Sequence, residues 1–453
     1  MKCTSLSIGG AVLEIVFAAS CGAAVPNTGA AIDGYVKPYV ESHNFSGVVL
    51  VEQKGSRVFE RSYGMADRER HKLNGRVTRF HVASMSMQFT ATAILRLVDQ
   101  GALDLDAHVG EYAAGVPGSD RITIRELLEE RSGLPDINGL ADYNDVLQQH
   151  QTPETLLAKI GGRPLLFEPG TKFLHEEHSA YNLLALIVEK KTGLPFAEAM
   201  EKLVFRPAGL AHSSIDDDRG VAEEARGYAP EGVDGLTAAP AIHWSGKSGN
   251  ASVCTSAEDE ARWVKTLLHG NLLSESSRKA MFDTAPDTGY GWMKRENREM
   301  KEQAFYMNGR APGFSSFVLY LPREELTVVV LSNVYSSATT TMGYDVAQVA
   351  LGRASEPLRL GAPLSAEALK SYKGVFAFGD DFYQPNGRLE LKPTVGYVSL
   401  EWPGGGASAL IPVGKDRFMD RSYWEPVVVE RDASGTAVAL RYGEFRGAAL
   451  RGE

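Results

Sequence analysis

The 453-residue chain contains 43% hydrophobic and 23% charged residues, a composition typical of a folded globular protein. Its formal net charge of -10 argues against a nucleic-acid partner, because neutralising phosphates requires a concentration of basic residues. The length exceeds that of one typical domain, so we expect a large principal domain and a smaller second unit.

Residues 1–24 have the pattern of a secretory signal. Lys2 precedes a largely apolar stretch over residues 8–19, which small residues follow. The pattern predicts export to the periplasm or to the outside of the cell, and Cys21 is the position where a lipid anchor would be attached. If the leader is not cleaved, the protein stays in the cytoplasm. No later stretch approaches about 18 uninterrupted apolar residues, so no membrane-spanning helix is expected after the leader.

The first elements after the leader predict a helix followed by a hairpin. The helix covers about residues 30–42, and strands cover residues 45–52 and 58–64 on either side of a polar turn. A buried helix follows from residue 89, because apolar residues recur there at helical spacing. Ser84 stands where the chain enters this helix. It is either an ordinary helix cap or a nucleophile whose oxyanion the free N–H groups of the first turn would stabilise.

The remainder of the chain divides into a mostly helical part and a part made of short strands. Residues 90–300 read as mostly helical, and strands return over residues 317–322 and 326–331 to complete a sheet. After residue 360, short strands alternate with Gly, Pro and Asp turns, which predicts a small all-β, barrel-like domain. We place the principal domain at 25–355 and the C-terminal domain at 360–453. Cys254, the only cysteine outside the leader, is expected to be a buried structural thiol.

Further landmarks follow Ser84 along the chain. They are Ser132-Gly133-Leu134-Pro135, Pro169-Gly170-Thr171-Lys172-Phe173, Tyr181-Asn182-Leu183-Leu184 and Pro312-Gly313-Phe314-Ser315. In this order and spacing, residues 30–350 closely resemble the serine β-lactamase and penicillin-binding-protein superfamily, in particular the class C β-lactamases and the related esterases and D-aminopeptidases. The resemblance implies an α/β (α+β) fold, with a helical region against an antiparallel sheet, and makes Ser84 the nucleophile. The C-terminal domain resembles the β-barrel appended to some of these esterases and peptidases.

The three catalytic motifs of that superfamily are degenerate in this chain. The S-x-x-K motif reads Ser84-Met85-Ser86-Met87, which keeps the serine and loses the lysine. The segment that should hold Y-x-N is one residue longer and reads Leu174-His175-Glu176-Glu177-His178-Ser179-Ala180. The K-T-G or H-x-G motif reads Met307-Asn308-Gly309, so the glycine remains and the cation is lost.

The resemblance also implies which residues would contact a substrate. The oxyanion donors would be the backbone N–H groups of Ser84 and Arg310, and the substrate-binding positions would be Met87, Met307, Asn308, Gly309 and Arg310. Removing one member of a nucleophile–base unit typically lowers the rate by about 10⁴-fold. Hydrolysis of β-lactams is therefore not expected. Because thioethers replace two cations, the site favours a small neutral, apolar molecule.

The loop that replaces Y-x-N contains the only titratable cluster at the position of the family base. His175, Glu176, Glu177 and His178 all lie in it. A histidine oriented by a carboxylate would deprotonate Ser84, and we favour His178 with Glu177 over His175 with Glu176. Alternatively, His175, Glu177 and His178 would bind a divalent metal, with His81 or His243 as a distant further ligand. A solvent-facing loop without chemistry is the third alternative.

Two classes of function follow. One is an enzyme of a serine-hydrolase fold that acts on a small neutral molecule, by ester or amide hydrolysis, by acyl transfer, or by acid–base chemistry such as isomerisation or cyclisation. It needs no cofactor unless the loop binds a metal. The other is a catalytically silent binding homologue. The sequence leaves the substrate and the oligomeric state open.

Overall fold

The structure, a computed structural model, describes residues 28–450 except for positions 176, 217–222, 284–287, 298–301 and 404. The predicted leader and Cys21 lie outside the described residues. In the part of the chain that is described, no helix is both long and apolar enough to cross a bilayer.

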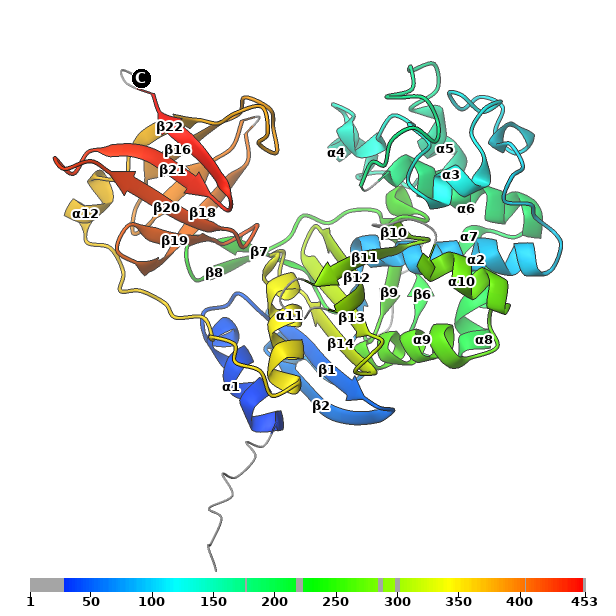
Figure 1. The fold of residues 1–453 in the computed structure, drawn as a ribbon, viewed down its shortest axis with the longest axis horizontal. Helices are drawn as coiled ribbons and strands as arrows, with labels where there is room; N and C mark the ends of the chain where they lie inside the picture. Colours follow the sequence, from blue (N-terminus) through cyan, green and yellow to red (C-terminus); the bar gives the residue numbers. More distant parts are fainter. Residues whose placement is uncertain are drawn as a thin grey trace, which may run out of the picture.

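A seven-stranded antiparallel sheet forms the centre of the principal domain (Figure 1). Its strand order is β10 (Thr288–Gly289), β11 (Trp292–Asn297), β12 (Glu302–Ala311), β13 (Phe314–Leu321), β14 (Leu326–Ser332), β1 (Gly47–Gln53) and β2 (Ser56–Tyr63). Every residue of β13 and β14 is buried, because helices cover both faces of the sheet. Helix α11 (Ala338–Ala350) packs on β13 and β14 beside α1 (Thr28–Glu41), and α9 (Ala257–His269) contacts β14 and β1. The predicted hairpin and the returning strands are confirmed.

A helical region meets this sheet at the 3₁₀ turn η1 (Ala83–Ser86), which contacts β12 and β13 and continues as α2 (Met87–Asp99). Ten of the thirteen residues of α2 are buried, so the helix predicted at this position is the core of the region. Helix α6 (His178–Thr192) packs against α2 and ends at Gly193 in the left-handed conformation (φ 66°). Around them lie the shorter helices α3 (Ile124–Leu128), α4 (Tyr143–Val146), α5 (Pro153–Ala158), α7 (Phe196–Met200), α8 (Arg206–Ala208) and α10 (Glu275–Asp283).

A small three-stranded sheet leads into η1. Strand β9 (Val253–Thr255) lies between β5 (Phe80–His81) and β6 (Ser214–Ile215). Its Cys254 is fully buried, and burial raises the pKa of the thiol well above its ordinary value. The expectation of a structural thiol is therefore confirmed.

The C-terminal residues form a closed eight-stranded barrel, as the rhythm of short strands predicted (Figure 1). Its strands are β15 (Gly374–Ala377), β16 (Arg388–Pro393), β17 (Val398–Glu401), β18 (Ala407–Gly414), β19 (Arg417–Asp420), β20 (Pro426–Arg431), β21 (Ala437–Tyr442) and β22 (Phe445–Ala449). Pairing of β15 with β22 closes the barrel, so no strand edge is left open. Helix α12 (Ala366–Lys370) precedes it.

A buried arginine joins the barrel to the principal domain. The Arg421 side chain, in the loop after β19, is fully buried. Its guanidinium donates to Asn44 Oδ1 (2.8 Å) and to the carbonyl oxygens of Glu231 (3.0 Å) and Gly232 (2.7 Å). Burial lowers the pKa of Arg421 to about 10, so the group remains a cation at neutral pH. Ser336 Oγ also donates to the carbonyl oxygen of Arg421 (2.8 Å).

Replacement of this arginine tests how firmly the barrel is attached. We expect Arg421→Met to lower the free energy of unfolding by about 3 kcal/mol, because buried acceptors lose their donor. Chemical denaturation, followed by tryptophan fluorescence, measures the change. The control is Arg446→Met, which removes an exposed ion pair with Glu430 and should change stability by less than about 1 kcal/mol. Equal effects of the two variants would contradict this account of the junction.

Candidate active site

Ser84 lies in a turn whose backbone conformation is strained. Ala83, directly before it, has a positive φ of 49°, which costs a non-glycine residue about 1 kcal/mol or more. Several hydrogen bonds hold the turn in place: Val82 N donates to Val253 O (3.1 Å), and Val82 O accepts from Ser316 Oγ (2.7 Å). Strain that the surroundings maintain in this way is common at functional sites.

Gly309 places strand β12 directly against this turn. A Cβ atom at position 309 would lie 2.2 Å from Val82 O and 2.8 Å from Ser84 N, so only glycine fits. Ser84 and Gly309 are therefore direct neighbours. The backbone N–H groups of Ser84 and Arg310 remain the predicted oxyanion donors.

The two methionines at the lost cation positions belong to the hydrophobic core. Met87 is 1% exposed and Met307 is 3% exposed, and both pack in one apolar cluster with α2. Being buried, they offer little surface to a substrate, although the sequence predicted both as substrate-binding positions. Ser84 itself is 6% exposed.

Asn308 and Arg310 face the barrel, although the sequence predicted both as substrate contacts. Asn308 lines a cavity of ≈ 610 Å³ between β12, the start of α11 and the barrel. The Arg310 guanidinium donates to Ser422 O (2.9 Å) and lies 4.2 Å from the ring centroid of Tyr423 and 4.5 Å from that of Tyr335. Its side chain therefore contributes to the junction between the two domains.

Glu177 fastens the Ser-Gly-Leu-Pro turn to the start of α6. The carboxylate is 1% exposed and accepts hydrogen bonds from Ser132 N (3.0 Å), Ser132 Oγ (2.9 Å) and Gly133 N (2.8 Å). Burial raises the pKa of Glu177 to about 7, and these hydrogen bonds offset only part of that effect. Both oxygens of the carboxylate are thus engaged by the turn.

The carboxylate in contact with His178 is that of Asp136, whereas the sequence favoured Glu177 as its partner. His178 Nδ1 lies 3.2 Å from Asp136 Oδ1 and 3.4 Å from Oδ2, and the histidine side chain is 13% exposed. The difference arises because the oxygens of Glu177 already accept hydrogen bonds from the turn at Ser132. Sequence reasoning missed Asp136, although its place directly after Pro135 was a usable signal.

The loop carrying Asp136 is held against α6 by one hydroxyl group. Ser179 Oγ donates to Pro135 O (2.7 Å) and accepts from Ile137 N (2.9 Å). The loop that carries Asp136 is therefore fixed against the start of α6, where His178 lies.

A single segment, residues 249–253, connects the start of α6 to the turn that carries Ser84. Asn250 Nδ2 donates to His178 O (3.4 Å), and Gly249 O accepts from Thr90 Oγ1 of α2 (2.7 Å). Val253 N, three residues on, donates to Ser86 Oγ (3.0 Å). Residues 249–253 therefore contact both the His178 backbone and the turn that carries Ser84.

A lysine–tyrosine pair lies beside the Asp136–His178 pair, and the sequence analysis did not find it. Lys247 Nζ donates to Tyr143 Oη (2.8 Å), and both side chains are largely buried. Burial, and next the charge of Asp136, raise the pKa of Tyr143. The two residues are 104 positions apart, so no local pattern reveals the pair.

Two residues of the predicted loop remain, His175 and Glu176. His175 is exposed, with its ring 6.3 Å from that of Phe173, and Glu176 lies outside the described residues. Among the residues that the structure describes, the group of three side chains spaced for a metal ion is His81, Asp216 and Glu224, not the His-Glu-Glu-His loop.

The fold and the comparisons with known proteins define the class of protein. Residues 32–351 match the family model described as Beta-lactamase, and the chain belongs to this family. It is 28% identical over 305 residues to the putative penicillin-binding protein PbpX of Bacillus subtilis, an alignment that covers 67% of this chain and 74% of that protein.

Solved structures extend the similarity. The penicillin binding protein from Bacillus halodurans aligns with a TM-score of 0.61 at 26% identity, over 70% of this chain and 98% of that one. The octameric penicillin-binding protein homologue from Pyrococcus abyssi aligns with a TM-score of 0.65 at 19% identity, over 92% of this chain and 99% of that one. The second alignment covers so much of this chain that it includes part of the barrel.

The buried carboxyl of Glu177 predicts a pH-dependent contribution to stability. Its folded-state pKa of about 7 exceeds the ordinary value of 4.5, so its contribution is fully present below about pH 4.5 and is lost as the pH rises through about 7. A shift of this size corresponds to about 3 kcal/mol. We expect the stability of the wild type relative to Glu177→Gln to fall by about that amount between pH 4.5 and 8, as measured by denaturant unfolding. Exposed Glu168→Gln is the control, and a constant difference would contradict the assignment.

Proposed function

We propose that the protein is an acyl hydrolase in which Ser84 is the nucleophile and His178, oriented by Asp136, is the proton-transfer group. The observation that carries this proposal is the 3.2 Å contact between His178 Nδ1 and Asp136 Oδ1. It supplies a carboxylate-oriented imidazole at the loop from which the family base is missing.

The contact with Asp136 selects the tautomer that a base needs. With the proton on Nδ1 bonded to the carboxylate, the lone pair of Nε2 is available for the Ser84 hydroxyl proton. Ser84 Oγ then attacks the carbonyl carbon of an ester or amide, and the N–H groups of Ser84 and Arg310 stabilise the oxyanion. His178 returns the proton to the leaving group, and water releases the acyl group by the same route.

The apolar surroundings of Ser84 favour a neutral acyl group. Met87 and Met307 replace two cations, and the nearby cation Lys247 is bonded to Tyr143. A carboxylate-bearing substrate would therefore lose charge-assisted hydrogen bonds and still have to be desolvated.

A binding protein without catalysis is the second candidate. It is favoured by the low exposure of Ser84, which is 6%, and by the burial of both methionines beside it. In that case the acyl-transfer machinery would be a remnant, and ligand binding would not depend on Ser84.

Active-site variants distinguish the two candidates. We expect purified protein to hydrolyse short p-nitrophenyl esters and to be labelled at Ser84 by a fluorophosphonate probe. Ser84→Ala, His178→Ala and Asp136→Asn should each lower kcat/KM by about 10³–10⁴-fold, because each removes one member of the unit. Exposed His71→Ala is the control for loss of a histidine. Turnover and labelling that survive in His178→Ala and Asp136→Asn would refute the proposed base, and an absence of both in the wild type would favour the binding protein.

Activity on β-lactams should be absent. The family's lysine and its second cation, which activate the serine and bind the substrate carboxylate, are replaced by Met87 and Met307. We expect nitrocefin turnover by the wild type to equal that of Ser84→Ala. Hydrolysis that disappears in Ser84→Ala would show that another group performs the work of the lysine.

A further inference from the structure

Three side chains of metal-ligand type converge just before the nucleophile turn. They are His81, Asp216 and Glu224, and their ligand atoms all lie within 4.8 Å of one another. His81 Nε2 lies 2.8 Å from Glu224 Oε1 and 3.4 Å from Asp216 Oδ2, and the imidazole is fully buried. In a tetrahedral site with metal–ligand bonds of about 2.0–2.1 Å, the ligand atoms stand about 3.3 Å apart. The separations from His81 Nε2, 2.8 and 3.4 Å, lie on either side of this value, so the three side chains are close enough to share one small ion.

Backbone hydrogen bonds hold the three ligands from separate segments. His81 on β5 and Ser214 on β6 both pair with Cys254 of β9, and Asp216 N donates to Ser252 O (3.0 Å). Glu224 is held through its neighbours, since Arg79 N donates to Glu223 O (3.0 Å) and Ala225 N donates to Arg79 O (2.9 Å). The site is thus positioned by the fold before any ion binds.

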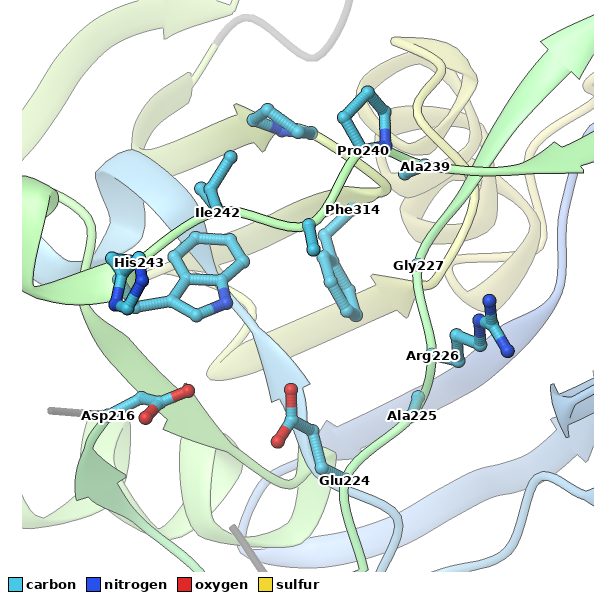
Figure 2. A pocket seen from close by; sticks show the side chains of 13 residues that line it. Asp216, Glu224, Ala225, Arg226, Gly227, Ala239, Pro240, Ile242, His243 and Phe314 are labelled. Atoms are coloured by element: carbon cyan, nitrogen blue, oxygen red, sulfur yellow. The ribbon is translucent and has the colours of Figure 1, made fainter. Parts of the chain in front are cut away.

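The cluster lies at one end of a cavity of ≈ 500 Å³. Figure 2 shows the carboxylates of Asp216 and Glu224 turned towards each other there, with Arg226 pointing away from them. Trp244 and Phe314 also line the cavity: the Trp244 ring stacks on the His81 imidazole with centroids 3.5 Å apart, and Phe314 meets the imidazole edge-on at 5.1 Å. Asp216 and Glu224 therefore line the cavity, whereas the His81 imidazole is covered by aromatic rings.

A hydrogen bond from His81 and a bound metal ion would hold this cluster together in different ways. One N–H of His81 donates along one direction, towards Glu224 at 2.8 Å, and the Asp216 oxygen at 3.4 Å lies at the edge of hydrogen-bond range. An ion between the three atoms would be bonded by all of them. Of two cations that the structure describes nearby, Arg79 Nη2 donates to Ser214 Oγ, and Arg226 Nη1 lies 3.5 Å from Glu69 Oε2.

We propose that His81, Asp216 and Glu224 bind a divalent first-row transition metal ion, with a fourth coordination position facing the cavity. One imidazole nitrogen with two carboxylate oxygens suits Zn²⁺, Mn²⁺ or Fe²⁺, whereas Mg²⁺ and Ca²⁺ prefer oxygen ligands alone. Three protein ligands with an open position are typical of metal sites that bind water or an oxygen donor of a small molecule. This site is independent of the function proposed for Ser84.

Calorimetric titration of the full chain, first freed of metal with a chelator, tests the proposal. We expect ZnCl₂ to bind at one ion per chain with a Kd below about 10 μM, and MgCl₂ to give no binding at the same concentrations. Asp216→Asn and Glu224→Gln, which preserve side-chain size, should each weaken zinc binding more than tenfold, since each removes a charged ligand. Circular dichroism verifies that both variants are folded.

Matched controls locate the ion. Glu223→Gln alters the neighbouring carboxylate, which pairs with Lys72, and should keep the wild-type affinity for zinc. His175→Ala and His178→Ala should keep it too, because both lie in the separate His-Glu-Glu-His loop. Failure of the wild type to bind zinc would overturn the proposal. Zinc binding of wild-type affinity in Asp216→Asn and Glu224→Gln would also overturn it. The same holds if only His175→Ala and His178→Ala lose zinc binding.

Discussion

The contact between strand β12 and the turn before α2 is the constraint on which the site depends. It exists because position 309 has no side chain, so the strand comes within contact distance of Val82 O and Ser84 N. The same carbonyl accepts a hydrogen bond from Ser316 Oγ on β13, and the chain turns through Ala83 in a left-handed conformation. The sheet therefore determines the direction in which the chain enters its central helix, and with it the position of the serine.

The parts of the fold that follow from local pattern were predictable. Two strand-like runs around a polar turn indicated the hairpin of β1 and β2, the spacing of apolar residues indicated α2, and the rhythm of short strands indicated the barrel. The proximity of Ser84 and Gly309 was implied by the resemblance to the superfamily, and the structure adds the steric reason that only glycine fits at position 309.

The chemistry was harder to predict, because it depends on pairs that are distant in sequence. Asp136 and His178 are 42 positions apart, and no periodic pattern connects them. The charge of Glu177 suggested a cleft residue, yet the carboxylate is buried and serves as an acceptor for backbone N–H groups. Likewise, the sequence suggested His81 only as a distant partner of the loop. In the structure, the register of β5 on β9 places it beside the carboxylates of Asp216 and Glu224.

Arg310 gives the barrel a connection to the oxyanion site. Its backbone follows Gly309 on the strand that presses against Ser84, and its guanidinium lies over Tyr423 and donates to Ser422 O in the barrel loop. The chain passes from one domain to the other near residue 360, yet the strand that contacts Ser84 also reaches the barrel loop through Arg310, so the two domains share this strand as a common boundary.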